Sequence, residues 1–500
     1  MRRILARPIL VLLGILPLLV LGWVAFQQVG SGFMPSMDEG GFILDYRSAP
    51  GTSLAETDRL LRQVETIIRA NPNVDTYSRR TGTQLGGGLT EANEGDFFIR
   101  LKPFPRDPID DVMDQVRAQA EHKVPGLDIE MAQLMEDVIG DLTAVPQPIQ
   151  IKIFSDDMDV LGTLAEKTAA AIGKIQGVVE IRNGINPAGD ALDIQVDRVK
   201  ASLEGVDPDA VTHMVQDALT GRVTTQIREG VKMVGVRVWI PAQLRSTESD
   251  MGKLLLRAPD GHLFPLKRVA HITTISGQPQ IGRENFKRMI AVTARISGRD
   301  MGSTIRDVKQ VMDAPGMLPH GVYYELGGLY QQQQIAFKGL MTVFAAAVIL
   351  VFLLLLFLYE RFRIALSILA IPLLSISAVF IGLWVTGIEL NISAMMGMTM
   401  IVGIVTEVAI FYFSEFQSLP ADMARVDALI EAGKNRMRPI AMTTLAAILT
   451  LLPLAFAIGQ GSAMQQPLAI AIVSGLVVQL PLVLLVMPVL FSLMEKKNDI

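Results

Sequence analysis

The sequence predicts an α-helical membrane bundle of six transmembrane helices that carries a large α+β region outside the bilayer. Half of its 500 residues are hydrophobic and 19% are charged, whereas soluble domains carry about 25% charged residues. The apolar residues are concentrated at the two ends of the chain, and the residues between them show mixed strand and helix patterning. The ends therefore predict the membrane part, and the middle predicts the α+β part.

The composition also excludes several classes of protein. The chain has no cysteine, which excludes disulfide frameworks, thiolate metal sites and cysteine nucleophiles. A net charge of −5 gives no general reason to expect a nucleic-acid partner. The remaining class is a membrane protein with a large part exposed to water.

The first apolar run, Pro8–Phe26, contains no charged residue. It follows three arginines, Arg2, Arg3 and Arg7. A bilayer core needs about 20 helical residues, so the run is long enough to span it. A cleaved signal peptide would have a shorter apolar region and a small-x-small cleavage site, which Trp23–Phe26 does not resemble. We therefore expect a retained first transmembrane helix within residues 1–28.

Five further apolar runs lie within residues 336–500, and we expect them to form a five-helix transmembrane bundle. The runs are Leu340–Tyr359, Ile364–Val385, Ile392–Phe413, Pro439–Ile458 and Pro467–Phe491. Each is long enough to cross a bilayer as a helix. Together with the first helix they predict a one-plus-five arrangement.

The lysines and arginines predict the orientation, because short cytoplasmic loops carry an excess of them. Under strict alternation the basic groups at the span ends fall on one side: Arg2, Arg3, Arg7, Arg361, Arg363, Lys434, Arg436, Arg438, Lys496 and Lys497. The opposite short loops, Thr386–Asn391 and Gly459–Gln466, contain neither Lys nor Arg. We therefore expect a multi-pass membrane protein with both termini in the cytoplasm and the long middle segment translocated. In a Gram-negative cell this means an inner-membrane protein with its middle segment in the periplasm.

Residues 29–145 show the order strand, helix, strand, strand, helix, strand, which is typical of the split β-α-β or ferredoxin-like unit. The expected strands are Gly41–Arg47, Val74–Arg79, Asp96–Leu101 and Leu127–Met131. The first helix is predicted to begin with a capping box, in which Ser53 and Glu56 satisfy each other's main-chain amides. The second is predicted to begin at Asp107-Pro108, a cap followed by proline at the first helical position.

A second unit of similar order is expected from residues 146–196 plus 276–335. Its expected elements are a strand at Ile149–Phe154, a helix at Met158–Ile175, strands at Val178–Asn183, Leu192–Val196 and Met289–Ile296, a helix near 303–312 and a strand at Val322–Leu326. Residues 197–275 interrupt this order and are predicted to form a separate mixed subdomain.

The part outside the membrane carries little catalytic signal. Its five histidines are scattered along the chain. The sequence has no Walker loop, no G-x-S-x-G and no H-E-x-x-H motif, and these are the motifs that bring a mechanism with them. The sequence therefore predicts neither an enzyme nor a bound metal or cofactor.

The membrane part carries the strongest functional signal, a carboxylate inside an apolar span. Glu407 lies within Ile392–Phe413, about 9 Å along the helix from the predicted cytoplasmic end at 1.5 Å per residue. An ionisable residue at this depth is costly and indicates a function by default. Glu415, at the end of the same helix, is expected to be solvated.

Two threonines and an arginine in the next span are candidates to act with this carboxylate. Thr443 and Thr444 are predicted to lie at the level of Glu407, and Arg436 marks the cytoplasmic end of their helix. Such a patch could take up and release a proton, because the charge state of a carboxylate responds to burial and to neighbouring charge. A topology-setting charge is an equally good interpretation of Arg436.

Layout and motifs together resemble the C-terminal half of the resistance–nodulation–cell-division (RND) efflux permeases, over essentially the whole chain. That family repeats a unit of one span, a large periplasmic block and five clustered spans. The motifs that carry the resemblance are Phe33-Met34-Pro35 with Asp38-Glu39-Gly40, the run from Arg436 to Thr444, and Gly459–Ser462. Gly403–Glu407 is similar to the heavy-metal efflux (CusA/CzcA-like) branch, which has glutamate at this position.

The resemblance implies efflux of metal ions or organic, xenobiotic compounds from the periplasm or inner membrane, driven by the proton gradient and without a cofactor. The two α/β units would be porter subdomains, and the insertion would be a docking subdomain. Glu407, Arg436, Thr443 and Thr444 would belong to the proton relay. The implied partners are a complementary N-terminal half or full-length protomers in a trimer, a periplasmic adaptor, an outer-membrane channel and the lipid bilayer.

Two departures from the family pattern shape these expectations. Copper and silver pumps of that branch carry methionine ligands, and Asp141, Val223 and Gln280 of this chain match at or near those places. Soft Cu(I) or Ag(I) requires thioether or thiolate ligands, so a copper pump is not expected, and zinc-class metals or organic compounds remain open. The family's relay aspartates come from the N-terminal half, and no Asp lies in any predicted span. We therefore expect that the chain does not complete the proton cycle alone. The alternative is an accessory membrane subunit of the SecDF type, or a remnant of a full-length gene.

Overall fold

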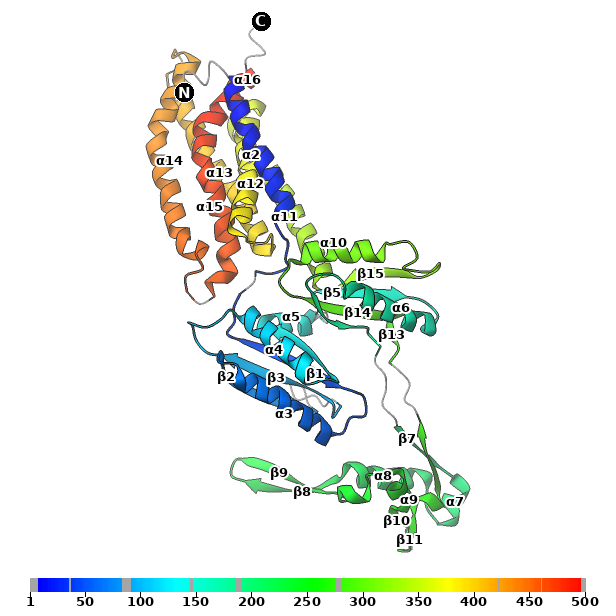
Figure 1. Cartoon of the computed structure of the whole chain (residues 1–500). Coiled ribbons are helices and arrows are strands. Elements are labelled where there is room, and N and C mark those ends of the chain that lie inside the picture. The colour runs from blue at the N-terminus through cyan, green and yellow to red at the C-terminus, as the bar shows by residue number, and fades with distance from the viewer. Residues whose placement is uncertain are drawn as a thin grey trace.

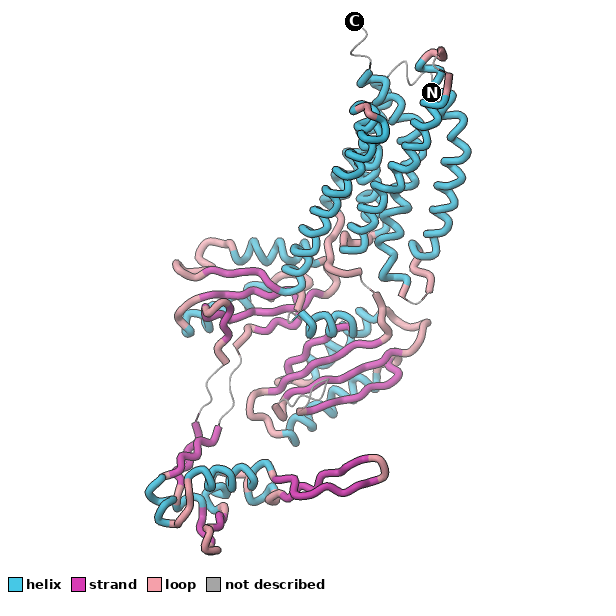
Figure 2. The backbone as a smooth tube through the Cα atoms, turned by 180° about the vertical axis from the view of Figure 1, so that it is seen from behind, coloured by secondary structure: helices cyan, strands magenta, loops and turns pink. Residues whose placement is uncertain are grey.

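The computed structural model describes residues 8–35, 37–82, 91–143, 147–185, 191–275, 280–420, 422–459 and 461–495. A bundle of long helices stands on a layer of two α/β units, and a smaller unit lies beyond the second of these (Figures 1 and 2). The predicted combination of an apolar helical part with a region of sheets and helices is confirmed.

The helical bundle contains most of the predicted spans. Its helices are α2 (Pro8–Gln28), α11 (Gly328–Tyr359), α12 (Phe362–Thr386), α13 (Ile392–Ser418), α14 (Arg425–Ala455), α15 (Gln466–Pro481) and α16 (Met487–Glu495), with short turns η3 (Ser462–Gln465) and η4 (Leu482–Val486). Within the described residues five helices are long and apolar enough to cross a membrane, the last of them running from Ser462 to Met494; the apolar helix Leu13–Gln28 is shorter. The start of α2 and the end of α16 lie at the end of the bundle remote from the sheets (Figure 1).

Two helices begin well before the predicted spans. Helix α11 starts at Gly328, and α14 starts at Arg425 and passes through Pro439 without ending. The polar first parts of both helices lie at or beyond the ends of the bundle, where water can solvate their side chains. Hydropathy identifies only the apolar part of a helix. It therefore predicts where a membrane span starts, whereas the helix itself can start earlier.

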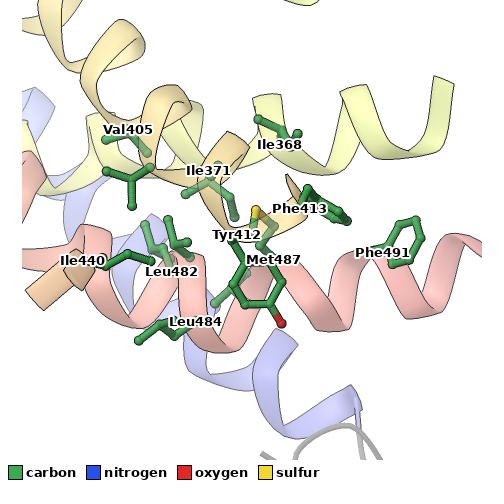
Figure 3. Packing of buried hydrophobic residues seen from close by; sticks show 14 of the residues in the cluster. Ile368, Ile371, Val405, Tyr412, Phe413, Ile440, Leu482, Leu484, Met487 and Phe491 are labelled. Carbon is green, nitrogen blue, oxygen red and sulfur yellow. The ribbon is translucent and has the colours of Figure 1, made fainter. Parts of the chain in front are cut away.

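The centre of the bundle is a continuous apolar core around α13. Val405, Tyr412 and Phe413 are fully buried there, and Figure 3 shows Tyr412 and Phe413 beside Met487 and Phe491 of the last helices. The Tyr412 hydroxyl donates to the Leu429 carbonyl oxygen at 2.6 Å. A buried hydroxyl needs such a partner, and this bond also ties α13 to α14.

The first α/β unit has the predicted order of elements. It consists of β1 (Gly41–Ser48), α3 (Leu54–Ala70), β2 (Val74–Thr81), β3 (Glu94–Leu101), α4 (Ile109–Lys123) and β4 (Leu127–Gln133). The sheet order is β2-β3-β1-β4, with antiparallel neighbours, which is the split β-α-β arrangement. A further helix, α5 (Leu134–Thr143), follows β4 without a loop and was not predicted.

The two predicted helix caps of this unit differ from expectation. Ser53 Oγ accepts from the Glu56 amide at 3.3 Å, but in the described structure the Glu56 carboxylate pairs with Arg59, so only half of the capping box forms. At α4 the cap position is Pro108 itself, and the Ile109 amide donates to Asp38 at 3.0 Å. Asp38, which is distant in sequence, therefore accepts the hydrogen bond at the start of α4 that the sequence predicts for Asp107.

The second unit is a five-stranded sheet that continues directly into the membrane. Its elements are β5 (Ile149–Phe154), α6 (Met158–Ile172), β6 (Val178–Arg182), β13 (Gly282–Glu284), β14 (Lys287–Ile296), α10 (Met301–Met312) and β15 (Tyr323–Gly327). The sheet order is β13-β14-β5-β15, and β6 also pairs with β14. Strand β15 ends at Gly327 and α11 begins at Gly328, so the sheet is joined without a loop to a helix that is long and apolar enough to cross a membrane.

The inserted unit is attached by a ribbon of two strands, β7 (Ala191–Val196) and β12 (Ala270–Ile275). It further contains α7 (Arg198–Leu203), α8 (Pro208–Thr220), β8 (Arg222–Glu229), β9 (Lys232–Val238), η1 (Ala242–Leu244), α9 (Glu248–Lys253), β10 (Leu255–Arg257), β11 (Leu263–Pro265) and η2 (Leu266–Arg268). The assignment of Leu192–Val196 to the second unit is wrong: within the described residues this strand pairs only with β12. A strand pattern identifies a strand and not its partner.

A buried ionic network joins the two α/β units. Arg295 of β14 is 5% exposed, and it bonds Glu130 of β4 at 2.9 Å and Glu136 of α5 at 2.8 Å. Arg182 of β6 bonds the other oxygen of Glu130 at 2.9 Å. Removing one partner of such a network leaves an uncompensated buried charge, which costs about 3–5 kcal/mol.

Glu180 extends this network from the second unit to the first. Its backbone φ of 50° lies in the left-handed region, which is strained for a residue other than glycine. Its carboxylate accepts from Arg117 of α4 at 2.6 Å and from the Met131 amide at 2.9 Å. These bonds between units therefore hold a backbone conformation that Glu180 would not adopt by itself.

A row of carboxylates crosses the first sheet beside this interface. Asp45 of β1 lies opposite Asp96 of β3 and Glu130 of β4. Arg80 bonds Asp96 at 2.7 and 2.8 Å, whereas Asp45 has no hydrogen bond or ion pair with any described residue. Burial, and then the negative charges of Asp137, Glu130 and Asp96, raise the pKa of Asp45 from 3.8 to about 7.

The network predicts that Arg295→Met loosens the contact between the two units. Loss of the guanidinium removes one of the two arginine partners of the buried Glu130 and the ion pair of the partly exposed Glu136, which lowers the free energy of opening by about 3 kcal/mol. Hydrogen–deuterium exchange of the β4 and β14 amides should then become about a hundredfold faster or more. Arg100→Met, which removes an exposed pair with Asp75, serves as the control and should change exchange little.

The row of carboxylates predicts that Asp45→Asn stabilises the protein at alkaline pH. The folded state binds the Asp45 proton more tightly than the unfolded state, so this group's contribution to stability falls as pH rises from about 4 to about 7. The asparagine variant should be roughly 2–4 kcal/mol more stable than the parent at pH 8 and similar to it at pH 4. Thermal unfolding of the parent and the variant at pH 4 and pH 8 measures this difference in stability. Asp75→Asn is the control, and an equal gain there would contradict the assignment.

Candidate functional site

A cavity of about 300 Å³ lies between α13, α14 and α15 of the helical bundle and is open on the side of the exposed Glu407 and Thr443. Its lining residues are Ile404, Glu407, Val408, Phe411, Arg436, Pro439, Ile440, Thr443, Thr444, Ala447, Leu476 and Gln479. All four residues selected from the sequence, Glu407, Arg436, Thr443 and Thr444, are among them. The three helices pack against one another (Figure 1), and the cavity between them has a mostly apolar lining that includes a few polar side chains.

Glu407 lies on the exposed side of α13. Its neighbours Thr406 and Val408 are buried, while Glu407 itself is exposed. Its carboxylate makes no hydrogen bond and no ion pair with the part of the chain that the structure describes. A charged carboxylate directed at lipid would be costly. The Glu407 carboxylate therefore has to be protonated, hydrated or covered by another protein surface.

The two threonines differ in what their hydroxyls contact. Thr443 is exposed, and its Oγ1 lies 3.1 Å from the Pro439 carbonyl oxygen and 3.0 Å from that of Ile440, within its own helix. Thr444 is buried, and its Oγ1 has no partner among the described residues. Only Thr444 therefore has a buried hydroxyl free for another group at the cavity.

Arg436 pairs with a carboxylate other than the predicted one. Its Nε and Nη2 lie 3.0 and 2.9 Å from Glu415 Oε2, and the Asn435 amide donates to the other oxygen at 2.9 Å. The expectation that Glu415 is solvated is wrong, since its side chain is 19% exposed and ion-paired.

The physical reason for this pairing is the antiparallel packing of α13 and α14. Glu415 follows Glu407 by eight residues, and Arg436 precedes Thr444 by eight. Both intervals correspond to about 12 Å along a helix. Arg436 therefore lies level with Glu415, and Glu407 lies level with the threonines.

Sequence reasoning missed Gln479 of α15. Its side chain is fully buried at the cavity. The available signal was a polar side chain within the apolar run Pro467–Phe491, which in a membrane helix indicates a functional position.

A second cavity, of about 270 Å³, lies where the bundle meets the α/β units. It is lined by residues of the first linker, including Phe33, Met34 and Glu39, and by Glu389 of a short loop of the bundle. Burial, followed by the charge of Asp300, raises the pKa of Glu389. The motif residues of the linker therefore line the joint between the two parts.

Asp38, in the same motif, has a structural role. It pairs with Arg106 and accepts from the Gly40 and Ile109 amides. Although burial acts in the opposite direction, these bonds hold the pKa of Asp38 below its ordinary value.

The described residues contain no group of three or more His, Cys, Asp or Glu side chains that could hold a metal ion. Of the three positions compared with methionine ligands, the Asp141 side chain lies outside the described ones. Val223 is exposed on the β8–β9 hairpin of the inserted unit, and Gln280 lies just before β13 of the second unit. These two units are well separated (Figure 1), so Val223 and Gln280 do not form one site.

Residues 1–495 match the family model described as the AcrB/AcrD/AcrF family. The chain belongs to this family of RND permeases. The membership expected from the motifs is confirmed, and the family consists of transporters and not of enzymes.

Several relatives in the family have metal or drug resistance in their names. The chain is 28% identical to the cobalt-zinc-cadmium resistance protein CzcA of Cupriavidus metallidurans over 486 residues, covering 94% of this chain and 46% of that protein. It is 28% identical to the nickel and cobalt resistance protein CnrA of the same organism, over 95% of this chain and 45% of that protein. It is 26% identical to the multidrug resistance protein MdtC of Pectobacterium carotovorum, over 97% of this chain and 47% of that protein.

A solved structure shares the fold. A crystal structure of a heavy metal efflux pump superposes with a TM-score of 0.81 at 24% identity, covering 99% of this chain and 51% of that one. The chain thus spans about half the length of the proteins that it matches.

The geometry of the first cavity predicts which positions of α13 are reachable from outside the bundle. The chain has no native cysteine, so Glu407→Cys and Val405→Cys each introduce a single thiol. Glu407 is exposed and Val405 is fully buried. A membrane-permeant maleimide should label the first about tenfold faster or more, because thiol reactivity follows exposure. Equal labelling rates would contradict the described placement of Glu407.

Proposed function

We propose that the chain is one half of an inner-membrane, proton-driven efflux permease, with Glu407 as its proton carrier. The observation that carries the proposal is a carboxylate without a partner, level with two threonine hydroxyls, at a cavity inside an apolar helix bundle. A group of this kind can change its charge state without first breaking an ion pair. Proton movement requires such a change.

The relay that we propose comprises Glu407, Thr443, Thr444 and Arg436. The hydroxyls lie at the level of the carboxylate and can pass a proton to it through water in the cavity. Arg436 and Glu415 lie about two turns nearer the end of the bundle that is remote from the sheets. We assign that end to the cytoplasm, where their ion pair would stabilise charge at the exit.

The exposed face of Glu407 supports a partner within the membrane. We infer that a complementary six-helix half covers this face and supplies the aspartates that the spans of this chain lack. Three such pairs would form the trimer. The inserted unit, at the far end from the bundle (Figure 2), would contact an adaptor and an outer-membrane channel as a docking subdomain, and the two α/β units would act as porter subdomains.

The substrates that we propose are divalent ions of the zinc and cobalt class. The printed names of the relatives CzcA and CnrA support this choice. A second candidate class is organic compounds, which the name of MdtC supports. The membership in a permease family favours a transporter over an accessory subunit.

The proposed carrier predicts that Glu407→Gln abolishes proton-coupled transport. The chain is reconstituted with a complementary half in vesicles carrying an imposed pH gradient, and uptake of Zn²⁺ is followed together with an internal pH dye. The amide cannot ionise, so Zn²⁺ movement and the coupled proton flux should both fall to the level of empty vesicles.

Glu431→Gln is the matched control, because Glu431 is an exposed glutamate on α14 that pairs with Lys434. It should transport like the parent. Zn²⁺ transport that survives in Glu407→Gln with its proton flux intact would rule out Glu407 as the carrier.

A further inference from the structure

Gln479 is a buried amide without a partner. It is 0% exposed, and neither its Nε2 nor its Oε1 makes a hydrogen bond with any described residue. It lines the same cavity as Glu407, from the third helix, α15. Buried polar atoms are almost always hydrogen-bonded, so each exception needs an explanation.

Three polar groups without partners surround this one cavity. They are the Gln479 amide, the Thr444 hydroxyl and the Glu407 carboxylate, one from each of the three helices. An unsatisfied buried group is unfavourable wherever it occurs. Two of the three groups at this cavity, those of Thr444 and Gln479, are buried, and the third is the exposed Glu407 carboxylate, so each is a candidate partner for the others, directly or through water.

The chemistry of glutamine suits a neighbour that changes its charge. A glutamine side chain carries two N–H donors and a carbonyl acceptor. It can donate to an ionised carboxylate and, after turning over, accept from a protonated carboxyl. A hydroxyl such as that of Thr444 has the same two capacities. No purely apolar or purely charged side chain could match both forms of Glu407.

The helix that carries Gln479 is irregular close to this residue. Pro481 follows it by two residues, and η4 (Leu482–Val486) is a π-helical turn. Such turns occur often at functional sites.

Few charged side chains line the cavity beside Glu407. Among the described residues that line the cavity, Arg436 is the other charged side chain, and it is paired with Glu415. The nearby Tyr412 and Tyr359 hydroxyls donate to main-chain carbonyl oxygens. No charged side chain of α11, α12 or α15 lines the cavity in the described chain.

We propose that Gln479, together with Thr444, is a positioning residue that solvates Glu407 in both its ionised and its protonated form. The inference rests on the proposed function, in which Glu407 carries the proton. It adds a third helix to the relay and assigns Gln479 a role that depends on protonation and not on packing.

The test measures protonation in this chain alone, purified in lipid bilayers. Infrared difference spectra over a pH series follow the carboxyl C=O band, and the band of Glu407 is assigned by its loss in Glu407→Gln. Gln479→Met keeps the volume and removes the amide. A hydrogen bond to the ionised carboxylate is about twice as strong as one to the neutral carboxyl, so loss of the amide destabilises the ionised form more, and the midpoint of the band should move to higher pH by about one unit.

Matched variants separate positioning from packing. Thr444→Val should shift the midpoint in the same direction, and Thr444→Ser, which restores a hydroxyl, should return it. Thr450→Val removes a hydroxyl on the same helix that bonds within the helix and does not line the cavity, so it should leave the midpoint in place. Gln479→Met should not lower the unfolding temperature, because the amide has no partner to lose.

The two possible failures are distinguishable. If the Glu407 band is present and its midpoint is the same in Gln479→Met as in the parent, the inference is wrong and the proposed function stands. If Glu407→Gln removes no band at any pH in the series, Glu407 does not titrate, and the proposed relay fails together with the inference.

Discussion

A lipid bilayer offers the polypeptide no water, and this constraint shapes the chain from its first helix to its last. Backbone groups within it must be satisfied internally, which leaves helices as the form for these apolar runs. Charged side chains accordingly gather at the ends of the bundle, where Arg436 and Glu415 pair. The same constraint makes the few polar groups within the bundle informative. Glu407, Thr444 and Gln479 are retained there at an energetic cost, and all three line one cavity.

The part outside the membrane is joined to the bundle by short connections. Strand β15 passes into α11 without a loop, and the Gln333 side chain of that helix donates to the Gly32 carbonyl oxygen at 2.8 Å. The linker after α2 also pairs with a loop of the bundle, since the Gly32 amide donates to the Leu390 carbonyl oxygen at 3.1 Å. These contacts hold the sheets and the helical bundle together at the joint between them.

Between the two α/β units the coupling is electrostatic. The Arg295 network is buried, and its members come from β4, α5, β6 and β14. A network of this kind contributes more to geometry than to net stability, because desolvation offsets much of the attraction. Its members belong to both units, so separating the two units would break these ion pairs.

Local signals in the sequence were sufficient for much of the fold. Apolar runs located the membrane helices, because a bilayer requires about 20 such residues in succession. Alternation and turn residues located most strands of both units, because strand and helix periods differ. The level of Glu407 with Thr443 and Thr444 also followed from the sequence, since the rise of a helix is constant.

What the sequence by itself determined is therefore which segments are helices or strands, and at what depth a side chain lies in the bundle. Only the tertiary structure decided which groups meet. It paired Arg436 with Glu415, gave the cap of α4 to Asp38, joined β7 to β12, and placed Gln479 beside the cavity. The reason is physical: periodicity and depth are properties of a single segment. Hydrogen bonds, ion pairs and strand pairing depend on the rotation and neighbours of that segment, which many distant residues set together.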